Sequence, residues 1–133
     1  MAKLPGEVRK LLEGKNFAFL STANKDGSAH VTPVWVDTDG ESVFINTAVG
    51  RVKHTNIKRD LRVGLSLVNQ EDPYKRGSLN GRVIEKVVGR RAEDHIDHLA
   101  KKYTGERKYK KSNTEEKRII FKIRVGKIFN LVA

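Results

Sequence analysis

The 133-residue chain contains no cysteine, only one methionine and one tryptophan, and few aromatic residues overall (7%). The absence of cysteine excludes disulfide bonds, thiolate metal sites and a cysteine nucleophile, and it fits a protein of a reducing cytoplasm. No stretch of the sequence reaches the roughly 20 apolar residues that a membrane-spanning helix needs. We therefore expect a soluble, cytoplasmic protein with no membrane partner.

Motifs of several common enzyme chemistries are also missing. The sequence has no glycine-rich strand-to-helix loop of the Rossmann or P-loop type and no serine in a nucleophile elbow. No pair of carboxylates stands out for acid–base catalysis. We therefore predict no catalytic side chain from the sequence, and expect that any difficult chemistry belongs to a bound cofactor.

Basic residues are abundant by contrast: 27 Lys and Arg face 16 Asp and Glu, a formal net charge of +11. Such a charge favours anionic partners, for example a phosphorylated cofactor or nucleic acid. Hydrophobic residues make up only 38% of the chain, which predicts one domain over residues 1–133 with a small core. A homodimer would bury further apolar surface between its subunits.

Short apolar segments separated by turns predict a mainly β protein with peripheral helices. The expected strands are Phe17–Thr22, Ala29–Val36, Ser42–Asn46, Arg62–Asn69, Ser78–Val88, Arg118–Val125 and Lys127–Val132. Helices are expected between Pro5 and Gly14, over residues 51–59 and over residues 91–103, the last ending at Gly105. Six to seven mostly adjacent strands are typical of a small antiparallel, Greek-key-like barrel.

The central segment of the chain is Ala29–Arg62, in which two strands joined by a turn lead into a basic helix. Alternation along its first strand predicts that Pro33 and Trp35 share one face, either in the core or against a flat aromatic ligand. At the helix start, Arg51 and Lys53 lie beside backbone N–H groups, a combination that suits a phosphate. The alternative is that these cations are simply solvated.

Two further patterns remain open as sites. His95 and His98 could place two metal ligands on one helical face, but no third ligand cluster accompanies them, so we predict a solvated helix face and no metal site. The basic run over residues 101–118 carries Tyr103 and Tyr109 and could bind single-stranded nucleic acid, solubilise the protein or attract an anionic cofactor tail. We expect little packing of residues 105–117.

Three stretches carry a resemblance to a known family. They are FLSTANKDGSAHVTPVWV at residues 19–36, a strand ending in Asn46-Thr47, and GRVKHTNIKRDLRVGLSL at residues 50–67. With them the chain resembles the pyridoxamine 5'-phosphate oxidase-like superfamily of FMN-binding split barrels, and most closely its small branch that uses FMN or the deazaflavin coenzyme F-420. The most specific part is Arg51-x-Lys53 followed by Asn56-Ile57-x-Arg59-Asp60-x-Arg62, and the similarity covers residue 17 to the end.

The resemblance implies a homodimer with two cofactor sites at the subunit interface, and hydride transfer between the cofactor and a small organic substrate. The residues that it implies for cofactor binding are His30, Val31, Thr32, Pro33, Val34, Trp35, Asn46, Thr47, Arg51 and Lys53. Those of residues 30–35 would lie along the flavin or deazaflavin ring. Asn46 and Thr47 would contact the ribityl chain or phosphate, and Arg51 and Lys53 would bind the phosphate.

Two departures from the family pattern bear on the activity. The FMN oxidases carry Arg and Lys at the two ends of the second strand, where this chain has His30 and Trp35. The substrate-binding tail of true pyridoxamine 5'-phosphate oxidases has no counterpart, so we do not expect that reaction. The basic surface slightly favours coenzyme F-420, whose tail is anionic, over FMN. The alternative is a non-catalytic protein on the same barrel that binds FMN or haem or, less favoured, nucleic acid.

Overall fold

The structure, a computed structural model, describes residues 3–132. Its strands are β1 (Ala18–Ala23), β2 (Ala29–Val34), β3 (Val36–Thr38), β4 (Ser42–Ala48), β5 (Arg62–Val68), β6 (Arg76–Val88) and β7 (Arg118–Val132). Its helices are α1 (Gly6–Glu13), α2 (Val52–Arg59) and α3 (Arg90–Thr104). The strands form one antiparallel sheet in the order β2-β1-β5-β6-β7-β4-β3, so the predicted mainly β, seven-stranded antiparallel architecture is confirmed.

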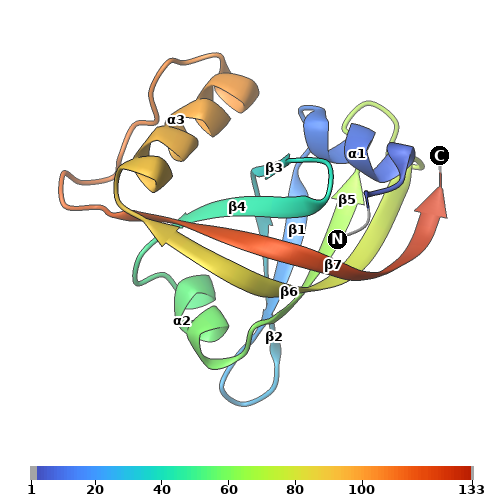
Figure 1. The fold of residues 1–133 in the computed structure, drawn as a ribbon, viewed down its shortest axis with the longest axis horizontal. Coiled ribbons are helices and arrows are strands. Elements are labelled where there is room, and N and C mark those ends of the chain that lie inside the picture. Colours follow the sequence, from blue (N-terminus) through green and yellow to red (C-terminus); the bar gives the residue numbers. More distant parts are fainter. Residues whose placement is uncertain (1–2, 133) are drawn as a thin grey trace.

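The two edges of this sheet are joined by a single residue. β2 is the strand at one edge and β3 the strand at the other, yet only Trp35 separates them in sequence. The sheet therefore curls until its edges approach each other, as Figure 1 shows. A closed or nearly closed sheet leaves few unpaired backbone groups at its edges.

This closure corrects the prediction of one continuous strand over residues 29–36. The chain pairs with β1 up to Val34 and with β4 from Val36 onward. The alternation of faces continues across the interruption: Val34 and Val36 are buried, whereas Pro33 is exposed and Trp35 is half-buried. Pro33 and Trp35 therefore share the less buried face, as predicted.

The core fills the inside of the curled sheet, where alternate residues of each strand point inward. Among its fully buried side chains are Leu12, Leu20, Ile45, Ile57, Leu67, Leu79, Phe121 and Ile123. β6 approaches its neighbour β7 closely at Gly81, where an added Cβ would lie 2.6 Å from Ile123 Cγ2. A shift in the β6–β7 register falls between Leu79 and Gly81, so this glycine allows the long strand to bend.

The helices cover the outside and one end of the barrel (Figure 1). α1 packs against β3 and β5 and buries Val8, Leu11 and Leu12. α2 contacts β1, while α3 lies against β4, β6 and β7. α3 ends at Gly105, whose φ of 82° is a left-handed conformation that glycine adopts easily. No helix among residues 3–132 is long and apolar enough to cross a membrane.

The C-terminal part also differs from the prediction. Residues 118–132 form one strand, not two strands divided at Gly126. Gly126 does not interrupt the strand, because β7 pairs with β6 from Ile119 to Val132. The register shifts at bulges, but the pairing does not stop. The long pairing partner, which local sequence does not reveal, keeps the strand extended.

Candidate functional site

A pocket opens where β2 gives way to β3, between the sheet, the start of α2 and α3. Its lining residues are Phe17, Pro33, Val34, Trp35, Asn46, Thr47, Arg51, Lys53, Ile96, Tyr109 and Arg118. The pocket has a volume of about 210 Å³. Seven of the ten predicted cofactor-binding residues therefore meet at one place. The other three, at positions 30–32, lie further along β2 and do not line this pocket, so their assignment stays a prediction.

Three cations surround this pocket. Arg51 is the residue that precedes α2, Lys53 lies in the first turn of α2, and Arg118 begins β7. Burial lowers the pKa of Lys53, and the neighbouring Arg51 and Arg118 lower it further. Because these positive charges repel one another, a bound anion would stabilise the protonated form of Lys53.

The same wall holds an unused hydrogen-bonding group. Thr47 is 2% exposed, and its Oγ1 has no hydrogen-bond partner among residues 3–132. Buried hydroxyl groups in proteins are nearly always hydrogen-bonded, so an unpaired one at a pocket wall indicates a place for a ligand atom. The start of α2 adds to this, because Arg51 makes no side-chain cap to its N–H groups. The N-terminal end of a helix carries a partial positive charge.

Arg118 is buried (3% exposed) and is held on three sides. Its Nε donates to Oδ1 of Asn46 over 2.9 Å, and its Nη1 donates to Oε2 of Glu116 over 3.0 Å. The Tyr109 ring lies 4.8 Å from the guanidinium carbon. Burial alone would raise the pKa of Glu116, but hydrogen bonds from Ser112 and Arg118 outweigh burial and lower it. Glu116 is therefore a carboxylate that fixes this arginine.

Phe17, Trp35 and Tyr109 are the aromatic residues that line the pocket, and Tyr103 packs behind two of them. Tyr103 stacks on Phe17 with ring centroids 5.7 Å apart and on Trp35 with centroids 5.3 Å apart. Tyr109 meets Trp35 edge-on at 6.2 Å. Tyr103 is 7% exposed, so the hypothesis that both tyrosines of the basic run are free to stack on nucleic acid bases is wrong for Tyr103.

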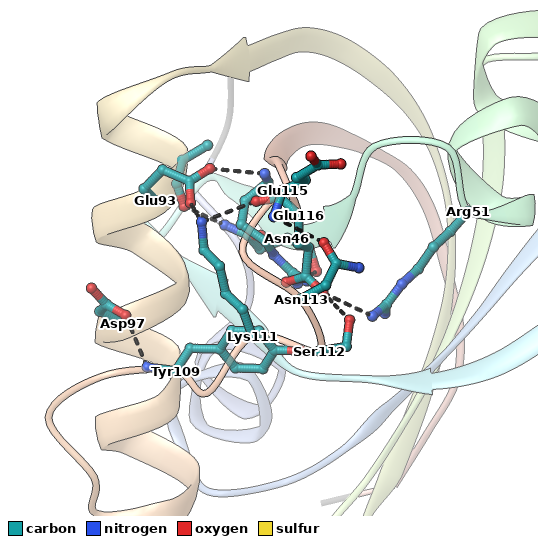
Figure 2. A network of polar contacts seen from close by, with 12 residues as sticks. Asn46, Arg51, Glu93, Asp97, Tyr109, Lys111, Ser112, Asn113, Glu115 and Glu116 are labelled. Atoms are coloured by element: carbon teal, nitrogen blue, oxygen red, sulfur yellow. Dashed lines mark hydrogen bonds and ion pairs between the residues drawn. The ribbon is translucent and has the colours of Figure 1, made fainter.

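Most residues of the segment 105–117 are exposed, as expected, but Tyr109 is half-buried and Glu116 is buried against residues of the site. Figure 2 shows Lys111 reaching from this segment toward Glu93 on α3, with which it forms an ion pair. The backbone N–H of Tyr109 donates to Asp97 over 2.8 Å, and Arg51 Nη2 lies 3.9 Å from Glu116 Oε1. No local pattern indicates these contacts, because their partners lie on α3 and at the residue that precedes α2.

His95 also departs from the expected solvated helix face. Its side chain is 13% exposed, whereas that of His98 is 66% exposed. His95 Nδ1 lies 3.1 Å from Asn46 Nδ2, and its Nε2 lies 3.5 Å from Asp37 Oδ2. Among residues 3–132 there is no group of three or more potential metal ligands.

Comparison with known proteins places this architecture in a family. The profile of the pyridoxamine 5'-phosphate oxidase family matches residues 4–131, which is nearly the entire chain. The chain belongs to this family. No protein of curated function matches the sequence significantly.

Solved structures agree with membership of the pyridoxamine 5'-phosphate oxidase family. The chain is similar to a structure named F420 reductase, with 23% identity and a TM-score of 0.77 over 95% of this chain and 98% of that one. It is also similar to a conserved hypothetical protein of Mycobacterium tuberculosis (20% identity, TM-score 0.71, 96% and 84% of the chains). A third is HupZ of Group A Streptococcus (18% identity, TM-score 0.62, 96% and 94%). These likenesses show the fold, the split barrel of the family.

Sequence reasoning missed several pocket residues of this family member: Phe17, Ile96, Tyr109 and Arg118. Arg118 opens a strand that reads as ordinary core, and nothing local distinguishes it from the 26 other Lys and Arg residues. Its neighbour Asn46 is 72 residues away in sequence.

Proposed function

We propose that this chain is a flavin- or deazaflavin-dependent oxidoreductase that transfers a hydride between its bound cofactor and a small organic substrate. The observation that carries this proposal is the pocket that Arg51, Lys53 and Arg118 line together with Thr47, whose buried hydroxyl has no partner among residues 3–132. Three cations and a free hydroxyl, next to an uncapped helix start, are the donors that a phosphate group requires.

In this proposal, different pocket residues contact the phosphate, the linking chain and the ring of the cofactor. Arg51 and Lys53 hold the phosphate, with Arg118 behind them, while Asn46 and Thr47 contact the linking chain. The ring lies along Pro33, Val34 and Trp35 and extends toward positions 30–32 of β2. His30 Nδ1 and Thr32 Oγ1 are buried without a hydrogen-bond partner among residues 3–132, but neither residue lines the pocket.

The bound flavin or deazaflavin supplies the hydride chemistry. The protein's contribution is to position the ring beside the substrate and to exclude water, and neither requires a protein nucleophile. Coenzyme F-420 is slightly favoured over FMN. The support is the +11 charge of the chain, which suits a more anionic cofactor, and its similarity to the F420 reductase structure.

A second copy of the chain completes the site in this proposal. The pocket of about 210 Å³ is smaller than the roughly 300–1,000 Å³ of sites that enclose a small-molecule ligand. Beside it, the outward face of β1 and β2 exposes apolar residues: Phe19 is 41% exposed and Val31 is 56% exposed. Phe19 and Pro33 are direct neighbours across the two strands. This apolar face is where the partner subunit packs, so that both subunits wall the cofactor.

The binding test is a titration of the purified protein with FMN and with coenzyme F-420, followed by the fluorescence of Trp35, the single tryptophan. We expect saturable binding and a loss of affinity of at least about tenfold in the double variant Arg51→Ala, Lys53→Ala. Lys58→Ala is the matched control, because Lys58 is exposed in the last turn of the same helix. Equal affinity of the double variant and the control would overturn the site.

Catalysis and assembly are tested separately. Hydride transfer is measured as the return of the oxidised cofactor's absorbance after the reduced cofactor is mixed with each of a panel of small organic acceptors. Binding without turnover would favour the alternative of a non-catalytic carrier, and salt-sensitive binding of oligonucleotide alone would favour nucleic acid. Light scattering should give the mass of a dimer for the wild type and of a monomer for Phe19→Lys. The titration should show weaker cofactor binding by the Phe19→Lys variant. A wild-type monomer with full affinity would contradict the shared site.

A further inference from the structure

A continuous series of polar contacts joins Asp37 on β3 to Arg118 in the pocket. Asp37 contacts His95, His95 contacts Asn46, and Asn46 accepts a hydrogen bond from Arg118. We propose that His95 is a positioning residue: in its neutral form it holds the Asn46 amide, and through it Arg118, in the orientation that binds the anionic end of the ligand. The inference rests on the proposed function of the pocket and adds a proton-dependent control to it.

The orientation of the Asn46 amide is determined by its neighbours. Its Nδ2 donates to the backbone carbonyl of Ala92 over 2.9 Å and faces His95 Nδ1 at 3.1 Å. Its Oδ1 accepts from Arg118 Nε over 2.9 Å. Rotating the amide by half a turn would point its oxygen at the Ala92 carbonyl and its N–H groups at the Arg118 N–H. One orientation alone satisfies all three neighbours.

This orientation fixes the protonation of His95. Because Asn46 presents an N–H group to Nδ1, that ring nitrogen must be the acceptor, and the single proton of the neutral ring lies on Nε2. Nε2 faces Asp37 Oδ2 at 3.5 Å, so the carboxylate favours the same tautomer. The ring is thereby set as an acceptor toward the pocket and a donor toward β3.

Adding a proton to His95 breaks this arrangement. The proton must enter at Nδ1, where it meets the N–H of Asn46, and two donors then face each other. Asn46 must move or rotate, and either change removes the acceptor from Arg118 Nε. Arg118 then keeps its contacts with Glu116 through Nη1, over 3.0 Å, and with the Asn46 backbone carbonyl through Nη2, over 3.3 Å. It loses the bond at Nε, the one contact that orients the guanidinium group from the side of Asn46 Oδ1.

The charges around His95 come from several elements. Asp37 on β3 faces it directly, and His98 on α3 lies 3.9 Å from the same carboxylate oxygen. Lys102 on α3 interacts with the charge of Asp37, which favours the protonated form of Lys102 and opposes the effect of burial on its pKa. From β7, Lys122 lies over the Phe44 ring, whose edge meets His95. Of these groups, none but His95 contacts Asn46, so titration of the others does not act directly on Arg118.

The proposal predicts a change of ligand affinity at low pH that is opposite to the change expected from Coulomb attraction alone. A positive charge gained by His95 near an anion site would, by Coulomb attraction alone, strengthen binding at low pH. Loss of Arg118 positioning instead weakens it. The ligand's own phosphate also titrates in this range, but it does so equally with every protein variant. The ratio of affinities between variants therefore isolates the contribution of position 95.

The first test uses the protein without ligand. Side-chain NMR resonances of the Asn46 amide and the Arg118 Nε–H group are followed across a pH titration, together with the resonances of the His95 ring, which report its charge directly. Both should shift with the midpoint of the His95 ring in the wild type and in His98→Asn. They should stay constant in His95→Asn, which keeps an acceptor near the place of Nδ1 but does not titrate. Resonances that ignore the His95 titration, or a ring that stays neutral throughout, overturn the proposal.

The second test measures FMN affinity by Trp35 fluorescence over the same pH range. The ratio of wild-type to His95→Asn affinity should fall about tenfold toward low pH, the equivalent of one lost hydrogen bond to a charged group. His98→Asn should retain the wild-type profile, and His95→Leu should bind weakly at every pH. A ratio that rises or stays constant contradicts the positioning role. If neither FMN nor F-420 binds, the proposed function fails, and the ligand-free resonances still decide the role of His95.

Discussion

The indole ring of Trp35 lies flat against the phenol ring of Tyr103, with centroids 5.3 Å apart and an angle of 4° between the planes. Trp35 is the residue that joins the two edges of the sheet, and Tyr103 belongs to the last turn of α3. The stack therefore ties the helix to the closure point of the barrel. Trp35 also lines the candidate pocket, so the closure of the sheet and the site share this residue.

Tyr103→Phe should lower the free energy of unfolding by about 1–3 kcal/mol. The Tyr103 hydroxyl accepts from the Val36 N–H over 3.2 Å and donates to the Asn16 carbonyl over 2.6 Å. Phenylalanine keeps the stack on Trp35 but leaves both backbone groups without this partner. Urea unfolding measures the change. Tyr74→Phe is the control, because Tyr74 is 79% exposed, and an equal effect of both changes would contradict the role of the hydroxyl.

Gly81→Ala should destabilise the barrel by about 1–3 kcal/mol. The added methyl group would lie 2.6 Å from Ile123 Cγ2 and 2.8 Å from the Arg124 carbonyl oxygen, and the backbone oxygen cannot move aside easily. Gly126→Ala is the matched glycine, since the nearest atom to its Cβ is the Asn80 carbonyl oxygen at 3.5 Å. Thermal unfolding should separate the two variants; similar melting temperatures would show that β6 and β7 are not closely apposed at Gly81.

Local signals explain why most elements could be predicted from the sequence. Pro5 and Gly14 flank α1, Gly105 ends α3, and alternate residues of β5 are apolar. Each of these features depends only on residues that are close together in the sequence. The phosphate-binding end of the pocket was predictable for the same reason, because Arg51 and Lys53 stand together at one helix start.

Features that depend on distant pairing could not be predicted in this way. The break at Trp35 follows from closure of the sheet, which involves strands from both ends of the chain. The role of Arg118 follows from Asn46 and Glu116, of which one is 72 residues away. The packing of Tyr109 follows from a hydrogen bond to Asp97 on α3 and from the edge-on contact with the Trp35 ring. Sequence periodicity carries no information on such contacts.

Glu116→Gln should lower the free energy of unfolding by about 3 kcal/mol at neutral pH, because Arg118 then remains buried without its carboxylate. The pKa of Glu116 is lowered in the folded protein, so its stabilising contribution is present above its unfolded pKa and disappears as the pH falls through its folded pKa. The difference between wild type and variant should therefore vanish in acid. Exposed Glu115 provides the control, Glu115→Gln, and a difference that persists in acid would contradict the ion pair.

Affinity for FMN should fall as the pH rises through the lowered pKa of Lys53. Burial and the charges of Arg51 and Arg118 favour loss of the Lys53 proton in the free protein, whereas a bound phosphate favours its retention. Binding at alkaline pH therefore takes up a proton, and full deprotonation should weaken affinity about tenfold. Calorimetry in buffers of different ionisation enthalpy measures the uptake. Lys53→Arg should abolish it because arginine stays charged, while Lys58→Arg should retain it; uptake that survives Lys53→Arg would assign the proton to another group.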